Sequence, residues 1–248
     1  RQLFVCLLMA FLGGEFLPGY WGGELRVGKF VGENDTVYNA DMQMEIRILM
    51  WDWGSVHLGM GGGQGLLMEK QSGPIIFDPA TTNYYFWSQL VWSCTHSCSL
   101  NFEFVHNCVH LVDRYAWVAQ GIFNRLRFFG DFFSVYKWGW LQGELGVGFY
   151  PHPEGMPYIN FNEEYAYDMW GEVRTQRKWH NIAVEGYGRG YWLWGVGGEG
   201  YPDIWLGVFF LFCGRGAELF ISAEYCVLSR EPMAAPSGMA KFSIGAKK

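Results

Sequence analysis

The sequence predicts an all-β fold, a transmembrane antiparallel up-and-down β-barrel of about 12 strands, within a range of about 10 to 14. Three observations predict it. Apolar and polar residues alternate with a period of two in segment after segment, which gives each segment a lipid-suited face and a charged face. The segments are about 9 to 14 residues long, the length of tilted membrane strands. Tryptophan and tyrosine gather near the segment ends, where the aromatic girdles of such barrels lie. The tryptophans expected there are Trp51, Trp53, Trp87, Trp92, Trp138, Trp140, Trp170, Trp179, Trp192 and Trp194.

The composition agrees with a barrel and disfavours other classes. Hydrophobic residues make up 50% of the chain and charged residues only 17%, below the roughly 25% of ordinary soluble domains. The mean hydropathy is nevertheless close to zero, because a barrel combines an apolar outer face with a polar lumen, whereas a helical membrane protein is far more apolar. The net charge of −6 does not match the basic surface of nucleic-acid-binding proteins, so we expect no nucleic acid among the partners.

We expect residues 1–19 to be a signal peptide or N-terminal segment, and residues 20–248 to form a single β-barrel domain. The longest apolar run, Leu3 to Leu12, is half of the roughly 20 residues that a membrane-spanning helix needs. It follows Arg1 and precedes small residues, as the apolar core of a secretory signal does. A short buried or interfacial helix is the alternative. No linker or shift in composition divides the rest of the chain.

The alternation can be followed along the chain. In the clearest early segment, Ile46 and Ile48 oppose Glu45 and Arg47. Later segments repeat the pattern with charged residues opposite apolar ones, at 125–137, 139–150, 160–174, 180–189, 217–227 and 241–244. Turn residues separate segments at 78–79, 151–153, 200–202 and 232–238. The alternative is a soluble β-sandwich, in which the charged face meets bulk water instead of an enclosed lumen.

We expect the charged face to form a ladder of ionic side chains that lines the lumen. A barrel of about twelve strands has a lumen that its own side chains can largely fill. Opposite charges on facing strands are then expected to pair across it. The ladder is expected to comprise Glu45, Arg47, Glu103, Arg125, Arg127, Asp131, Glu144, Glu164, Asp168, Glu172, Arg174, Glu185, Arg189, Glu218 and Glu224.

The segment 101–114 differs from the others because it carries His106, His110 and Asp113. On a strand the two histidines share a face but lie about 13 Å apart, too far for one metal ion. A helical turn would bring both imidazoles together, and Asp113 could fix a tautomer. These three residues are the candidate catalytic set, at the barrel mouth. The alternative is a set of ordinary polar groups paired with the ladder. No serine has a spacing that marks it as a nucleophile, and we expect no metal and no cofactor.

The run from Met44 to Trp117 resembles a family of bacterial outer-membrane proteins of unknown function that carry a H-x-S-S-H-L-G-D-E element. At those positions this chain has His106, Asn107, Cys108, Val109, His110, Leu111, Val112, Asp113 and Arg114. Both histidines, the leucine and the aspartate match; both serines, the glycine and the glutamate do not. The segments FDPATTNYYFWSQLVW and WLQGELGVGFYPHPEG resemble the elements that flank it. The resemblance implies an outer-membrane barrel without an established activity, and the missing serines argue against a hydroxyl-dependent role.

The sequence favours a non-enzymatic barrel with a charged lumen, acting as a porin-like pore, a structural element or a subunit of an envelope complex. The alternative is an outer-membrane enzyme that acts on lipid or lipopolysaccharide through His106, His110 and Asp113. The expected partners are the lipid bilayer and other envelope or membrane-complex subunits. The expected location is the outer membrane of a Gram-negative-type bacterium. An organelle outer membrane is the alternative location, because the chain ends in Gly-Ala-Lys-Lys and not in an aromatic residue.

Overall fold

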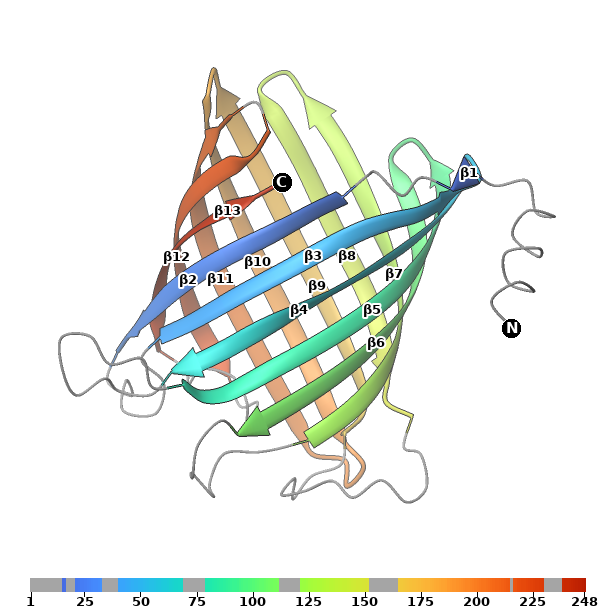
Figure 1. The fold of residues 1–248 in the computed structure, drawn as a ribbon, viewed down its shortest axis with the longest axis vertical. Coiled ribbons are helices and arrows are strands. Elements are labelled where there is room, and N and C mark those ends of the chain that lie inside the picture. The colour runs from blue at the N-terminus through green and yellow to red at the C-terminus, as the bar shows by residue number, and fades with distance from the viewer. Residues whose placement is uncertain are drawn as a thin grey trace.

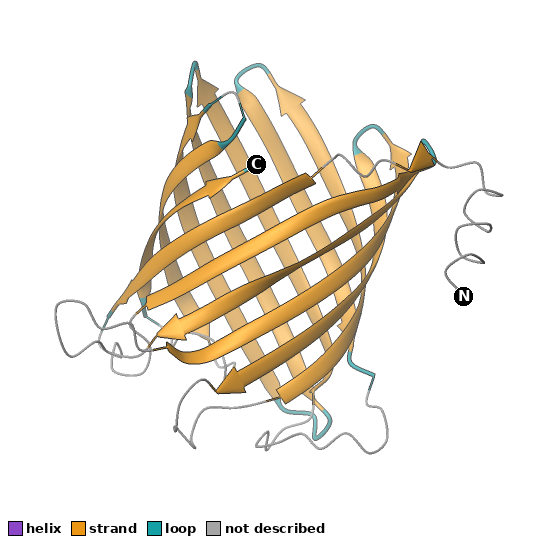
Figure 2. Cartoon of the chain, in the orientation of Figure 1, coloured by secondary structure: helices purple, strands orange, loops and turns teal. Residues whose placement is uncertain are grey.

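The computed structural model describes residues 15–16, 21–32, 40–68, 79–111, 121–151, 165–214, 216–229 and 238–248. In these ranges the chain forms a closed antiparallel barrel of twelve strands, which confirms the predicted fold class and strand number (Figure 1). All described elements are strands (Figure 2). Within the described residues, no helix is long and apolar enough to cross a membrane. The predicted signal segment 1–19 lies outside the described residues apart from Glu15 and Phe16.

The strands follow one another around the wall in chain order. The barrel strands are β2 (Trp21–Val31), β3 (Ala40–Asp52), β4 (Val56–Met68), β5 (Pro79–Thr95), β6 (Cys98–Leu111), β7 (Gly121–Tyr136), β8 (Gly139–Phe149), β9 (Tyr165–Trp179), β10 (Ile182–Gly195), β11 (Gly200–Cys213), β12 (Glu218–Ser229) and β13 (Ala240–Lys247). Pairing of β13 with β2 closes the sheet. The short β1 (Glu15–Phe16) adds to β3 at Asp52. Closure leaves no sheet edge among these twelve strands, as a wall in lipid requires.

The two ends of the barrel differ in their connections. At the short-turn end, the top of Figure 1, strands are joined at 53–55, 96–97, 137–138, 180–181 and 214–217. At the opposite end, which we call the long-connection end, the connections span 32–39, 69–78, 112–120, 150–164, 196–199 and 230–239. Every connection at the long-connection end except 196–199 is longer than every turn at the short-turn end.

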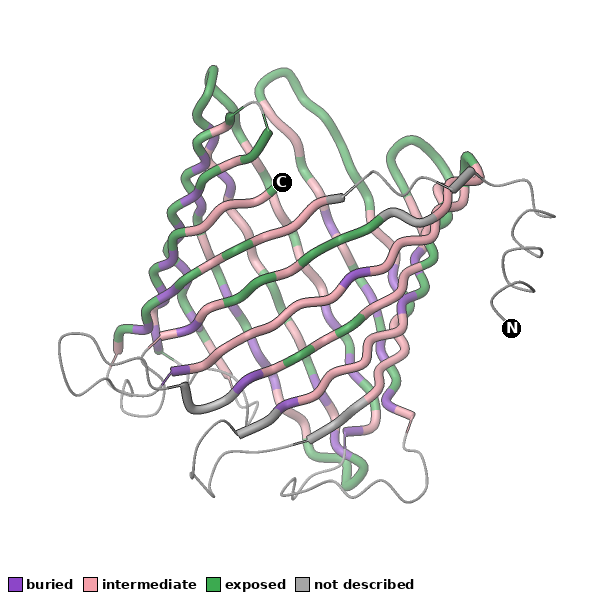
Figure 3. Tube along the Cα trace, viewed as in Figure 1, coloured by how far each residue is buried: buried purple, intermediate pink, exposed green. Residues whose placement is uncertain are grey.

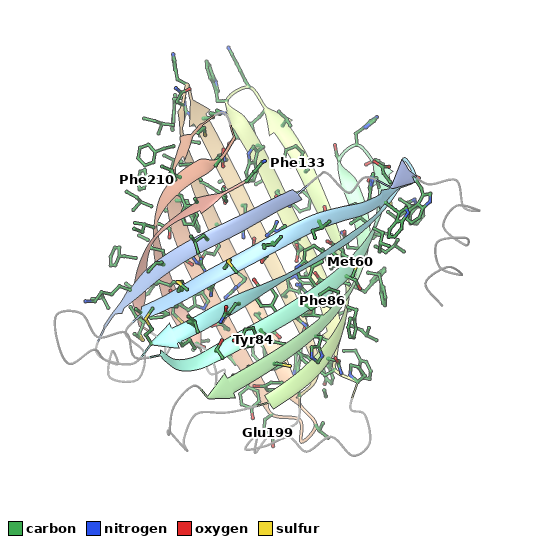
Figure 4. All side chains as sticks on the ribbon, in the orientation of Figure 1. Met60, Tyr84, Phe86, Phe133, Glu199 and Phe210 are labelled. Atoms are coloured by element: carbon green, nitrogen blue, oxygen red, sulfur yellow. The ribbon has the colours of Figure 1, made fainter. Side chains whose placement is uncertain are left out.

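The outward face is apolar and fits lipid. Along β12, exposed residues alternate with buried ones: Leu219 and Ile221 are 60% and 51% exposed, whereas Phe220 and Ser222 are buried. The same alternation runs along most of the wall (Figure 3). Large apolar side chains such as Phe210 project from the outside (Figure 4). Soluble proteins rarely expose apolar patches above a few hundred Å², so this surface belongs in a bilayer and the soluble sandwich is excluded.

The inward face combines aromatic and charged side chains, and glycines make room for them. A Cβ on Gly61 would lie 2.3 Å from the Trp87 ring, and one on Gly63 would lie 2.4 Å from the Tyr85 hydroxyl. Trp170 is also inward, 4% exposed, and its indole N–H donates to Glu144. Trp87 and Trp170 were expected in the interfacial girdles, but both fill the lumen. Trp170 shares the inward series of Asp168 and Glu172, and Trp87 shares that of Tyr85.

Candidate functional site

A cluster of polar side chains interrupts the apolar outer face on neighbouring strands. The register places Phe86 of β5, His106 of β6 and Asn124 of β7 side by side. Phe86 is 41% exposed on the outer wall, as is Phe102 further along β6 at 49%. Because side chains alternate across a strand, His106 and Asn124 share this outward face. Cys108, two residues on from His106, lies on it as well.

Cys108, His106 and Asn124 form a hydrogen-bonded chain. His106 Nδ1 lies 2.8 Å from Asn124 Oδ1. An amide oxygen can only accept, so Nδ1 carries the proton and donates to Asn124. His106 Nε2 is then the unprotonated nitrogen, and it accepts from the Cys108 thiol at 3.2 Å. The arrangement is a nucleophile, a base and a group that orients the base, all within hydrogen-bond reach.

The cluster lies near the long-connection end of the wall. β6 ends at Leu111, and at about 3.4 Å per residue with a tilt near 45°, Cys108 lies about 7 Å from that end along the membrane normal. Toward the short-turn end, the outward positions of β6 are Leu100, Phe102 and Phe104. The thiol therefore lies where the apolar band of this strand gives way to polar groups, near the long-connection end.

Tyr84 and Gln64 extend the polar cluster across two further strands. Tyr84 of β5 lies directly opposite Cys108, and Gln64 of β4 lies directly opposite Tyr84. The Gln64 amide donates to the Tyr84 hydroxyl at 3.3 Å and to the Thr82 hydroxyl at 3.2 Å. Tyr84 is 47% exposed on the outer wall (Figure 4). Polar groups on four adjacent strands thus form one continuous patch, which we call the lipid-side polar patch: Gln64, Thr82, Tyr84, His106, Cys108 and Asn124.

The structure changes the expected catalytic set. His106 lies in the wall of the barrel and faces outward, so its predicted place at the barrel mouth was wrong. His106 and His110 both belong to β6, which excludes the helical turn that would have joined them. The side chain of His110 and the whole of Asp113 lie outside the described residues. Among the residues described, no group of three or more potential ligands is arranged to hold a metal ion.

Sequence reasoning missed Cys108 and Asn124. The alternation in the sequence nevertheless indicated that both residues face outward. His106 and Cys108 fall in the same alternating series as Phe102 and Phe104, and Asn124 in the same series as Leu126 and Phe128. Polar residues in a lipid-facing series are costly and mark functional sites in membrane proteins.

The predicted ladder residues occupy the inward face and pair mainly with one another. Ion pairs join Arg125 to Asp168 at 2.6 Å, Arg127 to Glu103 at 2.7 Å, Arg174 to Glu185 at 3.3 Å and Arg189 to Asp203 at 3.2 Å. Others join Glu45 to Arg47, Glu172 to Arg174, Glu144 to Arg127, Glu218 to Lys247 and Glu224 to Arg26. Asp131 accepts from Ser99 and Asn101, and Glu164 lies outside the described residues.

A lumen cavity of about 530 Å³ lies between β2 to β5 and β9 to β13. Its walls carry charges of both signs, and several were not expected from the sequence. Lys241 and Asp41, 2.5 Å apart, are both nearly fully buried there. Arg26 faces the cavity beside Glu224 at 3.3 Å. Arg26, Asp41 and Lys241 belong to the inward series of their strands, and they were not among the ladder residues predicted from the sequence.

The opposite side of the lumen is filled by a cation–aromatic cluster. The Arg127 guanidinium lies 3.9 Å from the centre of the Trp170 ring, and that of Arg125 lies 5.0 Å from it. Arg125 also lies 5.3 Å from the centre of the Tyr191 ring, whose hydroxyl donates to Asp168. Each desolvated cation–aromatic pair of this kind stabilises the packing by roughly 2 kcal/mol. This cluster therefore fills the lumen behind β7, the strand that carries Asn124.

The fold is shared with solved outer-membrane barrels. The KdgM porin superposes with a TM-score of 0.54 at 10% identity, over 91% of this chain and 97% of that chain. The outer membrane phospholipase OMPLA of Salmonella typhi, a dimer with bound calcium, gives 0.51 at 10% identity, over 94% and 91%. LpxR from Salmonella typhimurium gives 0.50 at 5% identity, over 90% and 99%. No protein-family model and no curated protein matches the sequence. At these identities the likeness establishes the fold alone.

Proposed function

We propose that the chain is an outer-membrane acyl hydrolase that uses Cys108 as nucleophile, His106 as base and Asn124 as orienting group. The observation that carries the proposal is the thiol–imidazole–amide chain on the lipid-facing wall. A purely structural cluster would more readily lie in the lumen, where the chain has abundant charged partners. The same triad logic, with cysteine, histidine and asparagine, recurs on unrelated folds of acyl-transfer enzymes.

The first step forms a thioester. His106 Nε2 takes the thiol proton, and Cys108 Sγ attacks the ester carbonyl carbon of a lipid. The carbonyl electron pair moves to oxygen and gives a tetrahedral oxyanion. When it collapses, the bond to the alcohol oxygen breaks and His106 returns the proton to that oxygen. Asn124 holds the imidazole in the tautomer that this transfer needs.

The second step releases the acyl chain. His106 takes a proton from a water molecule, whose oxygen attacks the thioester carbonyl. The carbon–sulfur bond then breaks, the thiolate recovers a proton from His106, and a fatty acid leaves. Water can reach the thiol because it lies at the interfacial depth of the wall and not at the middle of the apolar band.

The substrate we propose is an acyl ester of the outer leaflet. Bacterial barrels carry short turns on the periplasmic side and longer loops outside, and from this we infer that the long-connection end, and with it Cys108, faces the cell surface. One of the structural neighbours, OMPLA, is named as an outer membrane phospholipase. The proposal retains the lipid-acting alternative predicted from the sequence but replaces His110 and Asp113 with Cys108 and Asn124.

Replacing Asn124 with alanine tests the orienting role. The imidazole then loses the acceptor at Nδ1 and can rotate or change tautomer, so we expect kcat for fatty-acid release from phospholipid vesicles to fall about 10²-fold. KM is expected to stay unchanged, because Asn124 acts on the base and not on the lipid. Asn124→Asp is the matched control, since its carboxylate can accept the same hydrogen bond, and we expect it to recover most of the rate. Equal loss in both variants would contradict the role.

The lumen cavity favours a second candidate function, a small pore. It is large enough for small solutes and lined by charged groups, and the structural neighbour KdgM is a porin. Conductance across a planar bilayer tests this candidate. Discrete channel openings would support a pore, whereas a silent barrel with intact lipid hydrolysis would exclude it.

A further inference from the structure

Tyr84 flanks Cys108 on the side away from Asn124. Tyr84 is the residue of β5 directly opposite Cys108, whereas Asn124 belongs to β7 on the other flank of β6. Directly opposed side chains of an antiparallel pair have Cβ atoms about 4.5–5.5 Å apart. A carbonyl group attacked by Cys108 Sγ would therefore have a tyrosine on the flank away from Asn124, and a phenol side chain is long enough to reach across one strand spacing of about 4.8 Å.

Gln64 orients the Tyr84 hydroxyl. Its amide N–H donates to the phenol oxygen at 3.3 Å and to the Thr82 hydroxyl at 3.2 Å. A phenol that accepts a hydrogen bond is polarised and becomes a better donor through its own O–H. Gln64 lies on the lipid-facing surface, because its cross-strand neighbour Met44 is exposed there. An amide in this environment is energetically unfavourable unless it is hydrogen-bonded.

We propose that Tyr84, held by Gln64, is a catalytic residue that donates its phenolic hydrogen bond to the lipid carbonyl oxygen as it becomes an oxyanion. The inference rests on the proposed hydrolase function and adds the group that stabilises its transition state. The developing negative charge forms at low dielectric, where one aimed donor lowers the barrier enough to change kcat by about 10²–10³-fold. Tyr84 is placed for this by register, and Gln64 and Thr82 fix its orientation.

The test compares acylation with alkylation of the same thiol. The full chain, refolded in detergent micelles, is reacted with p-nitrophenyl octanoate, and separately with iodoacetamide while the Cys108 peptide is followed by mass spectrometry. Acylation passes through an oxyanion and alkylation does not. We expect Tyr84→Phe to slow acylation about 10²-fold or more and to leave the alkylation rate of Cys108 unchanged. Gln64→Leu should slow acylation by a smaller factor, and Tyr225→Phe, on an exposed tyrosine of β12, should change neither rate.

Three outcomes would overturn the inference. Undiminished acylation in Tyr84→Phe would show that the phenol does not touch the oxyanion. An equal fall in acylation and alkylation would show that Tyr84 acts on the thiol or on the fold. If the wild-type chain shows no acylation that depends on Cys108, the proposed hydrolase function itself fails and takes this inference with it. Cys108-dependent acylation that Tyr84→Phe leaves intact removes only the role of Tyr84.

Discussion

Replacing Cys108 with alanine is expected to lower the rate of fatty-acid release from phospholipid vesicles by at least about 10³-fold, which is typical of a lost nucleophile. The thiol is the atom that bonds to the substrate, so His106 has no proton to take once the thiol is gone. The folded barrel should persist, because Cys108 is only partly buried on the outer wall and packs in no core cluster.

Cysteines elsewhere in the barrel provide the controls. Cys98 is exposed at the short-turn end, and Cys94 is exposed beside it. Alanine at either position should leave the hydrolysis rate as in the wild type. If Cys108→Ala retained the wild-type rate, or if Cys98→Ala lost as much, the thiol of Cys108 could not be the nucleophile.

The second large effect is expected on stability, from Lys241→Met. Lys241 and Asp41 lie 2.5 Å apart with side chains 5% and 3% exposed, so removing the amine leaves a buried carboxylate without its cation. Loss of one partner of a buried pair destabilises by about 3–5 kcal/mol. Urea unfolding of the barrel in lipid vesicles, followed by the fluorescence of its 13 tryptophans, measures the change.

Arg47→Met is the matched control for that measurement. Arg47 pairs with Glu45 on β3, but its side chain is 61% exposed, and exposed pairs contribute at most about 1 kcal/mol. The double variant Lys241→Met with Asp41→Leu should recover most of the lost stability, because no unpaired charge remains. Equal losses from Lys241→Met and Arg47→Met would contradict the account of the buried pair.

The fold could be predicted because apolar and polar residues alternate with a period of two along many of the strands. Ile46 and Leu219 lie outward as their series requires, and Glu224 lies inward. The register between strands could not be read, since it depends on pairing across the wall and not on any one segment. The inward tryptophans were misplaced for a different reason: Trp170 was assigned by residue type, whereas its position in its strand, in series with Asp168 and Glu172, directs it into the lumen.

The candidate site was only partly predictable. His106 stood out as a histidine, but its partners come from the next position of its own outward series and from a neighbouring strand. Asn124 is 18 residues away from His106, and only the register of β6 against β7 brings it to the imidazole. Asp113 was chosen for nearness in sequence, and it lies outside the described residues.

The most direct test of the account is the mass of the Cys108 peptide after acid quench of a reaction with phospholipid vesicles. We predict that the mass of the Cys108 peptide increases by that of one acyl chain of the supplied lipid. Hydroxylamine should remove this acyl group, and the Cys108→Ala variant should not acquire it. Turnover of the lipid without an acyl group on Cys108 would contradict it.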